Sequence, residues 1–445
     1  MTPETRRTFL KVSGAVLGGI ATGTTVTAAE RTDRFIVETK GGSLPGDLEV
    51  IHEMPGVDFA IVRASEPELQ DARGVRDYAP DVEIRLDDPD VNEEAPTVDE
   101  TSVADEPFYP LQWDKQALDV ETAHETTTGE GTRVTIIDTG VAAGHPDLEV
   151  NEDLSRNFTG DGLGSANPAG GYHGTHVGGI VAAQTNGEGV AGTAPGTDLV
   201  DCRVFSPGAL ASFGDILAAI VYSAMIDADA ANLSLGAYPV PRQANGQFYG
   251  RALNSTMTYA NKEGTLLVLA AGNDAADLQH DKNFISLPNE GAQGLSVAAT
   301  GPVGFNWGDE GLEEPPTSPA FYTNYGTNAV DLAAPGGDAD LEAAEAEVPG
   351  WYFDLVLNTI AEPVYETDDD GNVTGIDGSV YSYGWAAGTS MAAPQVAGAA
   401  ALVKSANPSY DANQVESALE RAADVPDGYD KTYYGSGFLN IVDAL

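Results

Sequence analysis

Cysteine is almost absent from the 445-residue chain: Cys202 is the only one, so no intramolecular disulfide bond can form. Cys202 lies in the apolar segment "LVDCRVF", which is typical of a buried strand. A nucleophilic thiol is the alternative, but no histidine lies near Cys202 in the sequence. We therefore expect Cys202 to be a packing residue.

Basic residues are also scarce. Lysine and arginine together number 21 against 69 aspartate and glutamate residues, which gives a formal net charge of −48. This charge repels nucleic acid phosphates, so we expect no nucleic acid partner. It also destabilises a compact fold in dilute buffer, whereas at molar salt the Debye length shrinks to about 3 Å. Because the acidic residues are spread among apolar segments, a salt-adapted folded surface is favoured over a disordered acidic chain.

The first 29 residues resemble a twin-arginine export signal. Arg6 and Arg7 precede a weakly apolar, Gly/Thr-rich stretch that ends on the small residues Ala28 and Ala29. An uncleaved membrane anchor is the alternative, but the apolar run is of borderline length and weakly hydrophobic for a bilayer span. We therefore predict secretion and no stable membrane span.

Residues 30–87 predict a small α+β unit. The runs "RFIVET", "LEVIHE", "VDFAIVRA" and "DVEIRL" are β-like, and a short helix is expected from about Glu66 to Arg73. Residues 88–104 are rich in acid and proline with almost no apolar content, which is typical of a flexible, cleavable linker. We place a domain boundary there and assign 105–445 to one larger domain.

Residues from Thr132 onward alternate short apolar strands with helical stretches. The strand candidates are "RVTIID", "LVDCRVF", "ANLSL", "TLLVLAAGN", "LSVAAT" and "AVDLAAPG". Continuous apolar strands separated by helices predict a doubly wound, mostly parallel α/β sheet with helices on both faces. We expect the helix after Ser212 to begin with a capping box formed by Ser212 and Asp215. In such sheets the ligand lies beyond the carboxyl ends of the strands.

Four polar residues occupy those strand ends or adjacent helix starts: Asp138, His173, Asn273 and Ser390. Taken alone, Asp138 would be a capping aspartate and Asn273 a turn residue. His173 and His176 could be a metal pair, but "HGTH" lacks the glutamate and the i, i+4 spacing of the zinc-helix motif. A catalytic imidazole beside a packing histidine fits this pattern better.

Ser390 lies in "GTSMAAP", at the start of a helix of small residues. A serine there could be only an N-cap. However, Gly388 and the alanines after Met391 remove bulk around the hydroxyl, and the helix start supplies backbone N–H groups and a positive dipole end. A reacting carbonyl could therefore approach Ser390 closely and have its developing negative charge stabilised.

Five segments in this order resemble the subtilisin-like serine peptidases, the subtilases: "IIDTGVAAGHPDL", "HGTHVGGIVAA", "LSLG", "VLAAGN" and "GTSMAAPQVAGAAALV". The resemblance covers roughly residue 105 to the C-terminus, and residues 30–87 resemble the family's inhibitory propeptide. It implies that Ser390 is the nucleophile, His173 the general base and then acid, and Asp138 the carboxylate that orients the imidazole. It also implies that the Asn273 amide and the Ser390 N–H stabilise the oxyanion.

The same resemblance implies how substrate binds. Ser234, Leu235 and Gly236 would pair with an extended peptide as an added strand, and Ala271 and Gly272 would line the first specificity pocket. We therefore expect extended peptides or proteins as substrates and the chain's own propeptide as an inhibitor. We expect the enzyme to be a monomer.

A structural calcium ion is also implied by the resemblance. Its ligands would come from Asp105, Asp147, Gln184, Asn186, Glu188 and Val190. Side-chain and carbonyl oxygens of this kind suit Ca²⁺. An acid-rich surface loop remains the alternative.

The chain departs from the family's pattern in two places. Gln395 stands where a histidine is common, although this position is outside the triad. The segment between Gly337 and Tyr383 is longer than the simplest members need, and its part "YETDDDGNVTGIDGS" predicts a β-hairpin turn.

These observations together predict a secreted, salt-adapted serine endopeptidase made as a zymogen, cut between about Asp88 and Asp105. One alternative is a narrow-specificity processing protease of one partner precursor, supported only by the long insert. Another is a catalytically inactive, subtilase-like binding protein, against which all three triad positions and the asparagine are filled.

Overall fold

The computed structural model describes residues 30–41, 46, 48–85, 106–208, 210–241, 246–281, 283–308 and 311–445. The predicted export signal and acidic linker lie outside these residues, and so does the predicted calcium ligand Asp105.

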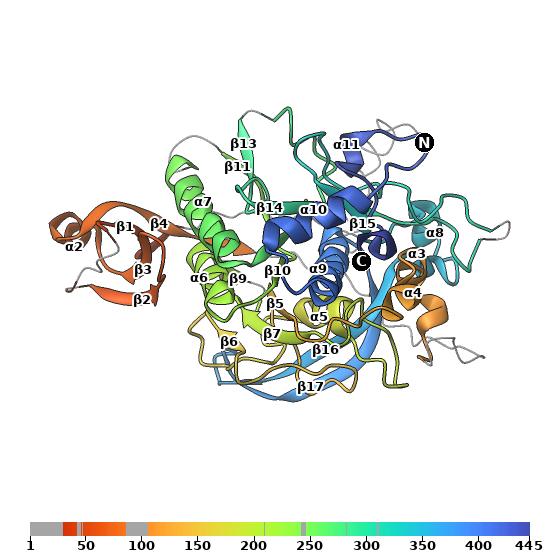
Figure 1. Cartoon of the computed structure of the whole chain (residues 1–445). Coiled ribbons are helices and arrows are strands. Elements are labelled where there is room, and N and C mark those ends of the chain that lie inside the picture. The colour runs from red at the N-terminus through yellow and green to blue at the C-terminus, as the bar shows by residue number, and fades with distance from the viewer. Residues whose placement is uncertain are drawn as a thin grey trace.

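A seven-stranded parallel sheet forms the centre of the molecule (Figure 1), in the order β15-β14-β12-β10-β5-β7-β6. The strands are β5 (Arg133–Asp138), β6 (Arg156–Asn157), β7 (Asp198–Arg203), β10 (Ala230–Leu233), β12 (Leu266–Ala270), β14 (Gly294–Thr300) and β15 (Leu332–Pro335). All neighbouring pairs run parallel. The predicted doubly wound α/β fold is confirmed.

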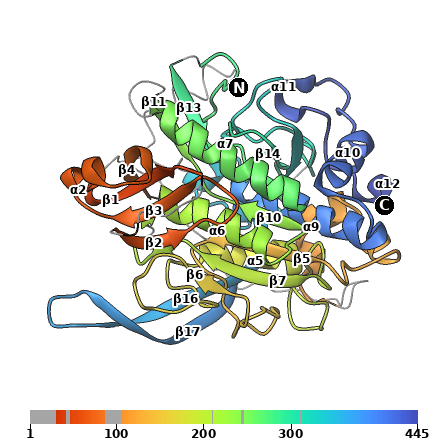
Figure 2. The same cartoon turned by 60° about the vertical axis from the view of Figure 1, so that its left-hand side comes forward.

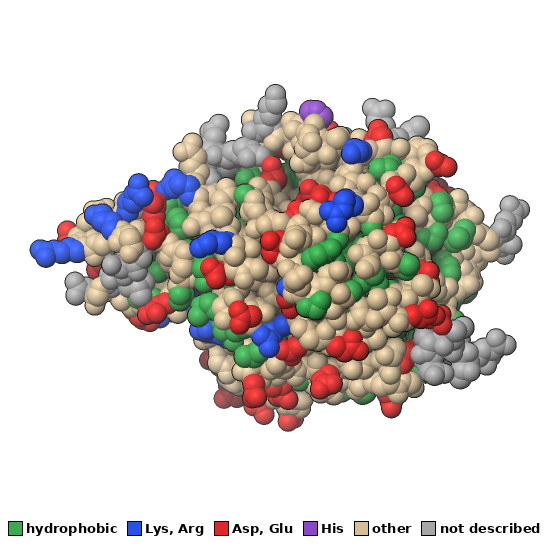
Figure 3. All heavy atoms as spheres, in the orientation of Figure 1, with side chains coloured by type: hydrophobic (Ala, Val, Ile, Leu, Met, Phe, Trp, Pro, Cys, Tyr) green, Lys and Arg blue, Asp and Glu red, His purple; other side chains and the backbone are tan. Residues whose placement is uncertain are grey.

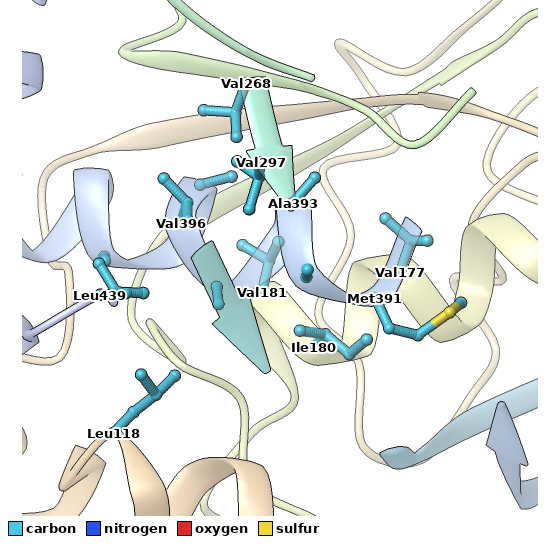
Figure 4. Close-up of a cluster of buried hydrophobic side chains, with 14 of the residues drawn as sticks. Leu118, Val177, Ile180, Val181, Val268, Val297, Met391, Ala393, Val396 and Leu439 are labelled. Carbon is cyan, nitrogen blue, oxygen red and sulfur yellow. The ribbon is translucent and has the colours of Figure 1, made fainter. Parts of the chain in front are cut away.

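Helices cover both faces of this sheet. On one face, α5 (His173–Ala182) and α9 (Thr389–Ala406) share an apolar cluster with Val268 of β12, and Figure 4 shows this packing. On the other face, α6 (Phe213–Met225) and α7 (Gly246–Glu263) pack with Leu267 and Leu269 of the same strand. Successive residues of a strand point to opposite faces, so the unbroken apolar run of β12 requires both layers.

The other described helices of the larger unit are short or peripheral. They are η1 (Tyr109–Leu111), α3 (Trp113–Ala117), α4 (Val120–His124), α8 (Leu341–Glu345), η2 (Trp351–Asp354), α10 (Ala412–Ala422), α11 (Lys431–Tyr434) and α12 (Ile441–Ala444).

Cys202 is fully buried in β7, as its apolar surroundings predicted, and burial raises the pKa of its thiol.

The N-terminal unit is antiparallel and contains β1 (Glu30–Thr39), β2 (Glu49–Glu53), β3 (Phe59–Arg63), α2 (Glu66–Asp71) and β4 (Val75–Arg85). The predicted strands and helix are therefore present. Its sheet continues into the larger unit through β9 (Leu210–Ser212) and β8 (Phe205–Ser206), because β4 pairs with β9. Figure 2 shows this unit against α6 and α7.

Two further antiparallel pairs complete the fold. The strands β11 (Ala237–Pro241) and β13 (Phe284–Leu287) form one, and β16 (Val356–Thr367) and β17 (Val373–Ala386) form a long hairpin that projects from the body in Figure 2. The predicted turn is confirmed: Asp368 N–H donates to Asn372 O at 3.0 Å, and Gly371 N–H donates to Asp368 O at 3.0 Å.

One local prediction is wrong. Ser212 has the extended backbone of an N-cap, with φ −99° and ψ 140°, but its side chain makes no capping hydrogen bond within the described residues. The carboxylate of Asp215 instead binds Arg34 and His52 of the N-terminal unit. A cation from a distant part of the chain has displaced the local interaction.

Acidic side chains are scattered over the face drawn in Figure 3, whereas Lys and Arg side chains gather on the N-terminal unit at the left and lie singly elsewhere on that face. Within the described residues, no helix combines the length and the apolar character needed to cross a bilayer.

Candidate active site

Asp138 and His173 meet where the sheet and α5 come together. Asp138 is the last residue of β5, His173 is the first residue of α5, and both are fully buried. His173 Nδ1 lies 2.8 Å from Asp138 Oδ1, and the same oxygen accepts the Thr139 N–H at 2.7 Å. A carboxylate accepts hydrogen bonds, so Nδ1 carries the hydrogen and Nε2 is the basic atom of the neutral ring.

Glycine allows this approach. A β-carbon on Gly174 would lie 2.7 Å from the carbonyl oxygen of Gly140, in the turn after β5. The Gly174 N–H also donates to the Thr139 hydroxyl at 2.8 Å. The start of α5 is therefore fixed directly against the residues that follow Asp138.

His176, the second histidine of α5, has a packing role. Its Nε2 lies 3.2 Å from the carbonyl oxygen of Val356 and 3.1 Å from that of Gly384, on the two strands of the β16–β17 hairpin. Complete burial lowers the pKa of His176 to about 3, so the ring is neutral. This arrangement favours the single catalytic imidazole over the metal pair.

Ser390 is the second residue of α9 and is buried, with only 8% of its surface exposed. Its hydroxyl donates to the carbonyl oxygen of Ser234 at 3.2 Å, and the Ser234 hydroxyl donates to the carbonyl oxygen of Ser390 at 2.7 Å. These reciprocal bonds join the start of α9 to the segment after β10. Met391 lies in the same apolar cluster as Val177, one turn beyond His173 (Figure 4), so α5 and α9 bring the serine and histidine segments together.

Asn273 is oriented by the residue before Ser390. Its side-chain oxygen accepts the Thr389 N–H at 2.9 Å and the Thr389 hydroxyl at 2.8 Å. A β-carbon on Gly388 would lie 3.3 Å from Asn273 Nδ2 and 3.5 Å from the Ser390 nitrogen. Two N–H donors therefore face one small space, which the absence of a side chain at Gly388 leaves open. Such a pair can stabilise an oxyanion.

The predicted substrate residues line two stretches near these donors. Ser234, Leu235 and Gly236 follow β10 outside regular structure, with the first two side chains buried. A β-carbon on Gly236 would approach only the Leu287 carbonyl oxygen, at 3.4 Å. Ala271 is buried, and Gly272 has a φ of +101°, which favours glycine. The Gly272 N–H donates to the Thr389 hydroxyl at 3.0 Å, so this stretch is connected to the serine segment.

Five of the six predicted calcium ligands lie in the described residues, and hydrogen bonds bring their segments together. Asp147 Oδ2 accepts the Val190 N–H at 3.0 Å, and the Gln184 N–H donates to the Asp147 carbonyl oxygen at 2.8 Å. The Asn186 side-chain oxygen accepts the Glu188 N–H at 2.9 Å, and its amide donates to the Pro146 carbonyl oxygen. The loop is therefore folded back on Asp147.

Glu106 also enters this loop, and sequence reasoning missed it. Its carboxylate accepts the N–H groups of Gly187 and Gly189 at 2.7 and 3.1 Å. Glu106 and Asp147 are fully buried, and burial raises the pKa of both carboxyl groups. Its position next to Asp105 in "DEPFYP" was the only available signal.

The donor set fits a hard cation. Asp147 Oδ1 is buried and has no hydrogen-bond partner among the described residues. In that part of the chain, no group of three or more His, Cys, Asp or Glu side chains is arranged for a metal ion, so a cation here depends on amide and carbonyl oxygens as well. Mixed oxygen ligands of this kind suit Ca²⁺.

Comparison with known proteins is consistent with this geometry. Residues 129–437 match the Subtilase family (Peptidase_S8). Subtilisin DY of Bacillus licheniformis is 31% identical over 316 residues, covering 71% of this chain and 91% of the relative. Halolysin of Haloferax mediterranei is 28% identical over 462 residues, covering 99% of this chain and 76% of the relative. The crystal structure of fervidolysin from Fervidobacterium pennivorans matches with a TM-score of 0.66 at 20% identity, covering 96% of this chain and 62% of that one.

Proposed function

The chain belongs to the Subtilase family and is a subtilisin-like serine endopeptidase, and we propose that Ser390, His173 and Asp138 form its catalytic triad. The observation that carries this proposal is the buried 2.8 Å hydrogen bond between His173 Nδ1 and Asp138 Oδ1. It assigns the hydrogen of the neutral ring to Nδ1 and leaves Nε2 as the atom that can accept a proton.

In the acylation step, His173 Nε2 removes the proton of the Ser390 hydroxyl as the oxygen attacks the peptide carbonyl. The tetrahedral intermediate collapses when the protonated imidazole gives that proton to the leaving amine, and an acyl-enzyme on Ser390 remains. Water then enters, loses a proton to His173 and releases the acid product as Ser390 is reprotonated. Asp138 stabilises the imidazolium in both half-reactions.

The charge that develops on the carbonyl oxygen is stabilised by the Asn273 amide and the Ser390 N–H. Both nitrogens face the space beside Gly388, and the Ser390 N–H belongs to the first turn of α9, where no intrahelical acceptor is available. The positive end of the α9 dipole acts in the same direction. These donors are fixed before the substrate arrives, which is what gives oxyanion stabilisation its effect.

Substrate is proposed to bind as an extended strand along residues 234–236, with its first side chain against residues 271–272. The reciprocal bonds between Ser234 and Ser390 support this, because they hold the strand-binding segment next to the nucleophile. Backbone hydrogen bonds then supply most of the affinity.

Residues 30–87 are proposed to be an inhibitory pro-region, removed by a cut between about Asp88 and Asp105. The contact of this unit with α6, α7 and β9 supports the proposal. Its apolar residues pack with those of α6 and α7, and its last strand, β4, pairs with β9 of the peptidase unit. Export through a twin-arginine signal and salt adaptation are proposed from the sequence. The excess of acidic over basic residues and the similarity to halolysin support salt adaptation.

A structural Ca²⁺ ion is proposed at Asp147. The residues that would hold it are Asp147, Asn186 and the carbonyls of Gln184, Glu188 and Val190, and the buried Glu106 carboxylate lies in the same loop. The further predicted ligand, Asp105, lies outside the described residues. When bound, the ion neutralises buried carboxylates and stabilises the fold; it takes no part in peptide hydrolysis.

The test is digestion of casein compared with a panel of precursor proteins in molar salt. A general endopeptidase degrades casein at many positions, and the Ser390→Ala variant does not. Cleavage of a single precursor with intact casein would instead support a narrow processing protease. If a folded and processed chain cleaves neither casein nor any precursor protein, the proposal is contradicted.

A further inference from the structure

The N-terminal unit covers the first turn of α6. Its Ile36, Phe59 and Ile61 lie in one apolar cluster with Phe213 and Ile216 of α6. The Tyr249 hydroxyl of α7 donates to the carbonyl oxygen of Pro80 at 2.8 Å. In β9, Ser212 lies opposite Glu83 of β4. Ser212, at the start of α6, is therefore enclosed by the N-terminal unit.

A buried group of charges lies within this contact. Arg34 Nε donates to Asp81 Oδ2 at 2.6 Å, and Arg34 Nη2 donates to Asp215 Oδ1. His52 Nε2 lies 2.7 Å from the same Asp215 oxygen and 3.1 Å from the Phe158 carbonyl oxygen. None of these four charged or titratable residues is more than 8% exposed. Asp215 is the only one of the four that belongs to the peptidase unit.

The N-terminal unit also caps α6 from outside. Asp81 Oδ1 accepts the Gly214 N–H at 2.9 Å, a bond that a residue preceding the helix usually makes. The helix thus obtains its N-terminal acceptor from a residue 133 positions earlier in the chain. If the N-terminal unit leaves, α6 loses this acceptor at the same moment as Asp215 loses Arg34 and His52.

The sequence around the start of α6 contains residues that could cap the helix without the N-terminal unit. Ser212 and Asp215 have the spacing of a capping box, and the Ser212 backbone already has an N-cap conformation. The same box forms elsewhere in this chain where no distant cation competes, between Ser65 and Glu68 and between Asp411 and Gln414. In α6 neither bond of the box is formed: the Ser212 side chain makes no capping bond, and the Asp215 carboxylate binds Arg34 and His52.

We propose that Asp215 exchanges partners on maturation: with the N-terminal unit bound, Asp215 holds Arg34 and His52, and after its departure Asp215 accepts the Ser212 N–H and completes the capping box. This inference rests on the proposed role of residues 30–87 as a removable pro-region. The N-terminal turn of α6 is then a recognition surface for an arginine. Because Ser212 and Arg34 compete for one carboxylate, formation of the box in the mature enzyme weakens rebinding of the pro-region.

The exchange predicts opposite effects for two variants. Ser212→Ala leaves the bound state unchanged, because the Ser212 side chain makes no cap there, but in the free state it removes the half of the box in which the Ser212 hydroxyl accepts the Asp215 N–H. The pro-region should then bind about fivefold more tightly, the effect expected for loss of one serine cap. Arg34→Gln removes the bond from Arg34 to Asp215 and should weaken binding at least tenfold.

The experiment uses the Ser390→Ala chain, cut in the linker by a trace of wild-type enzyme. Size-exclusion chromatography over a dilution series in molar salt gives the dissociation constant of the cut complex. Asp411→Ala is the matched control for Ser212→Ala, because it breaks the intact box of α10 far from the contact. Arg63→Gln is the control for Arg34→Gln, because Arg63 is exposed and its partners Asp33 and Glu49 lie in the same unit. Both controls should bind as the parent does.

The exchange is overturned if Ser212→Ala binds the pro-region with the parent's affinity or more weakly. If Arg34→Gln prevents folding, Ser212→Ala still decides the question. If the wild-type enzyme neither cuts its own linker nor that of the Ser390→Ala chain, the proposed function fails. If the linker is cut, the two parts stay bound, and Ser212→Ala has the parent's affinity, the exchange alone is wrong and the proposed function stands.

Discussion

The side-chain oxygen of Asn273 accepts two hydrogen bonds from Thr389, one from its backbone N–H at 2.9 Å and one from its hydroxyl at 2.8 Å. An amide whose oxygen is held in this way must turn its nitrogen to the opposite side, towards the space beside Gly388. Thr389 thereby orients the amide that we propose as an oxyanion donor.

Thr389→Val should lower kcat while leaving KM nearly unchanged. The variant keeps the shape and the backbone N–H of Thr389 but loses the hydroxyl that fixes Asn273 and accepts the Gly272 N–H. Loss of one such bond corresponds to about a 3- to 10-fold decrease in kcat, less than the 10²–10³-fold expected for Asn273→Ala. Steady-state kinetics on a peptide substrate measure both effects.

The control for this prediction is Thr256→Val, which removes a buried hydroxyl that donates to the Ala252 carbonyl oxygen in α7. It should reduce stability without changing kcat. An equal decrease in kcat for both variants, or an increase in KM alone for Thr389→Val, would rule out the positioning role.

Asp201 should make stability depend on pH. This carboxyl group is fully buried in β7; its Oδ2 accepts the Ala166 N–H at 2.7 Å, and burial raises the pKa of Asp201 to about 7. In the unfolded chain an aspartate has a pKa of about 3.9. Between these values the folded state binds more protons, so its stability falls as the pH rises, and the full penalty remains above pH 7.

Asp201→Asn should therefore raise the free energy of unfolding at pH 8, by up to about 4 kcal/mol, and the gain should disappear near pH 4. Thermal unfolding of the Ser390→Ala chain across this range measures the effect without self-digestion. A gain that does not vary with pH would show that Asp201 remains ionised in the folded protein throughout.

Salt should distinguish two contacts of the N-terminal unit. Arg251 of α7 binds Asp77 at 2.8 Å and Glu38 at 3.3 Å with 48% of its side chain exposed, whereas the Arg34 side chain is 6% exposed. Exposed pairs are screened at molar salt and buried pairs much less. Arg251→Gln should weaken binding of the cut pro-region at 0.1 M salt by about two- to fivefold, and should have no effect at molar salt.

The effect of Arg34→Gln on the same dissociation constant should persist at molar salt. If both effects vanish together as salt is added, the buried group of charges is accessible to ions, and the recognition role of Arg34 fails.

Calcium should stabilise the fold through Asp147. A ligand at 1,000 times its dissociation constant raises the free energy of unfolding by about 4 kcal/mol, so the Tm of the Ser390→Ala chain should rise with added Ca²⁺ and fall with a chelator. Asp147→Asn should remove most of this dependence, and the exposed Asp153→Asn should not. A Tm that ignores Ca²⁺, or an equal response of both variants, contradicts the site.

The parallel sheet could be predicted because its strands are unbroken apolar runs such as "LLVLA" in β12, which only a two-sided sheet accommodates. The rule that sites lie at strand ends drew attention to Asp138 and Asn273, but taken alone they predicted a cap and a turn, and only the resemblance to the subtilases implied their roles. Ser390 and His173 were visible because both begin helices rich in small residues.

What the sequence did not predict depends on contacts between remote residues. The predicted Ser212–Asp215 box is wrong for this structure, because the Asp215 carboxylate binds Arg34, which is 181 positions away. Glu106 was hidden among many acidic residues, and only the folded loop of Gly187 and Gly189 distinguishes it. The role of Thr389 likewise appears only when β12 and α9 are brought together.

Active-site labelling tests the central claim most directly. A fluorophosphonate should modify the mature enzyme at one residue, and mass spectrometry of its peptides should identify Ser390. Ser390→Ala should not react, and Asp138→Asn should react far more slowly, because its ring would carry the hydrogen on the wrong nitrogen. A folded, processed enzyme that hydrolyses peptides but is labelled at another residue, or at none, would contradict the catalytic role of Ser390.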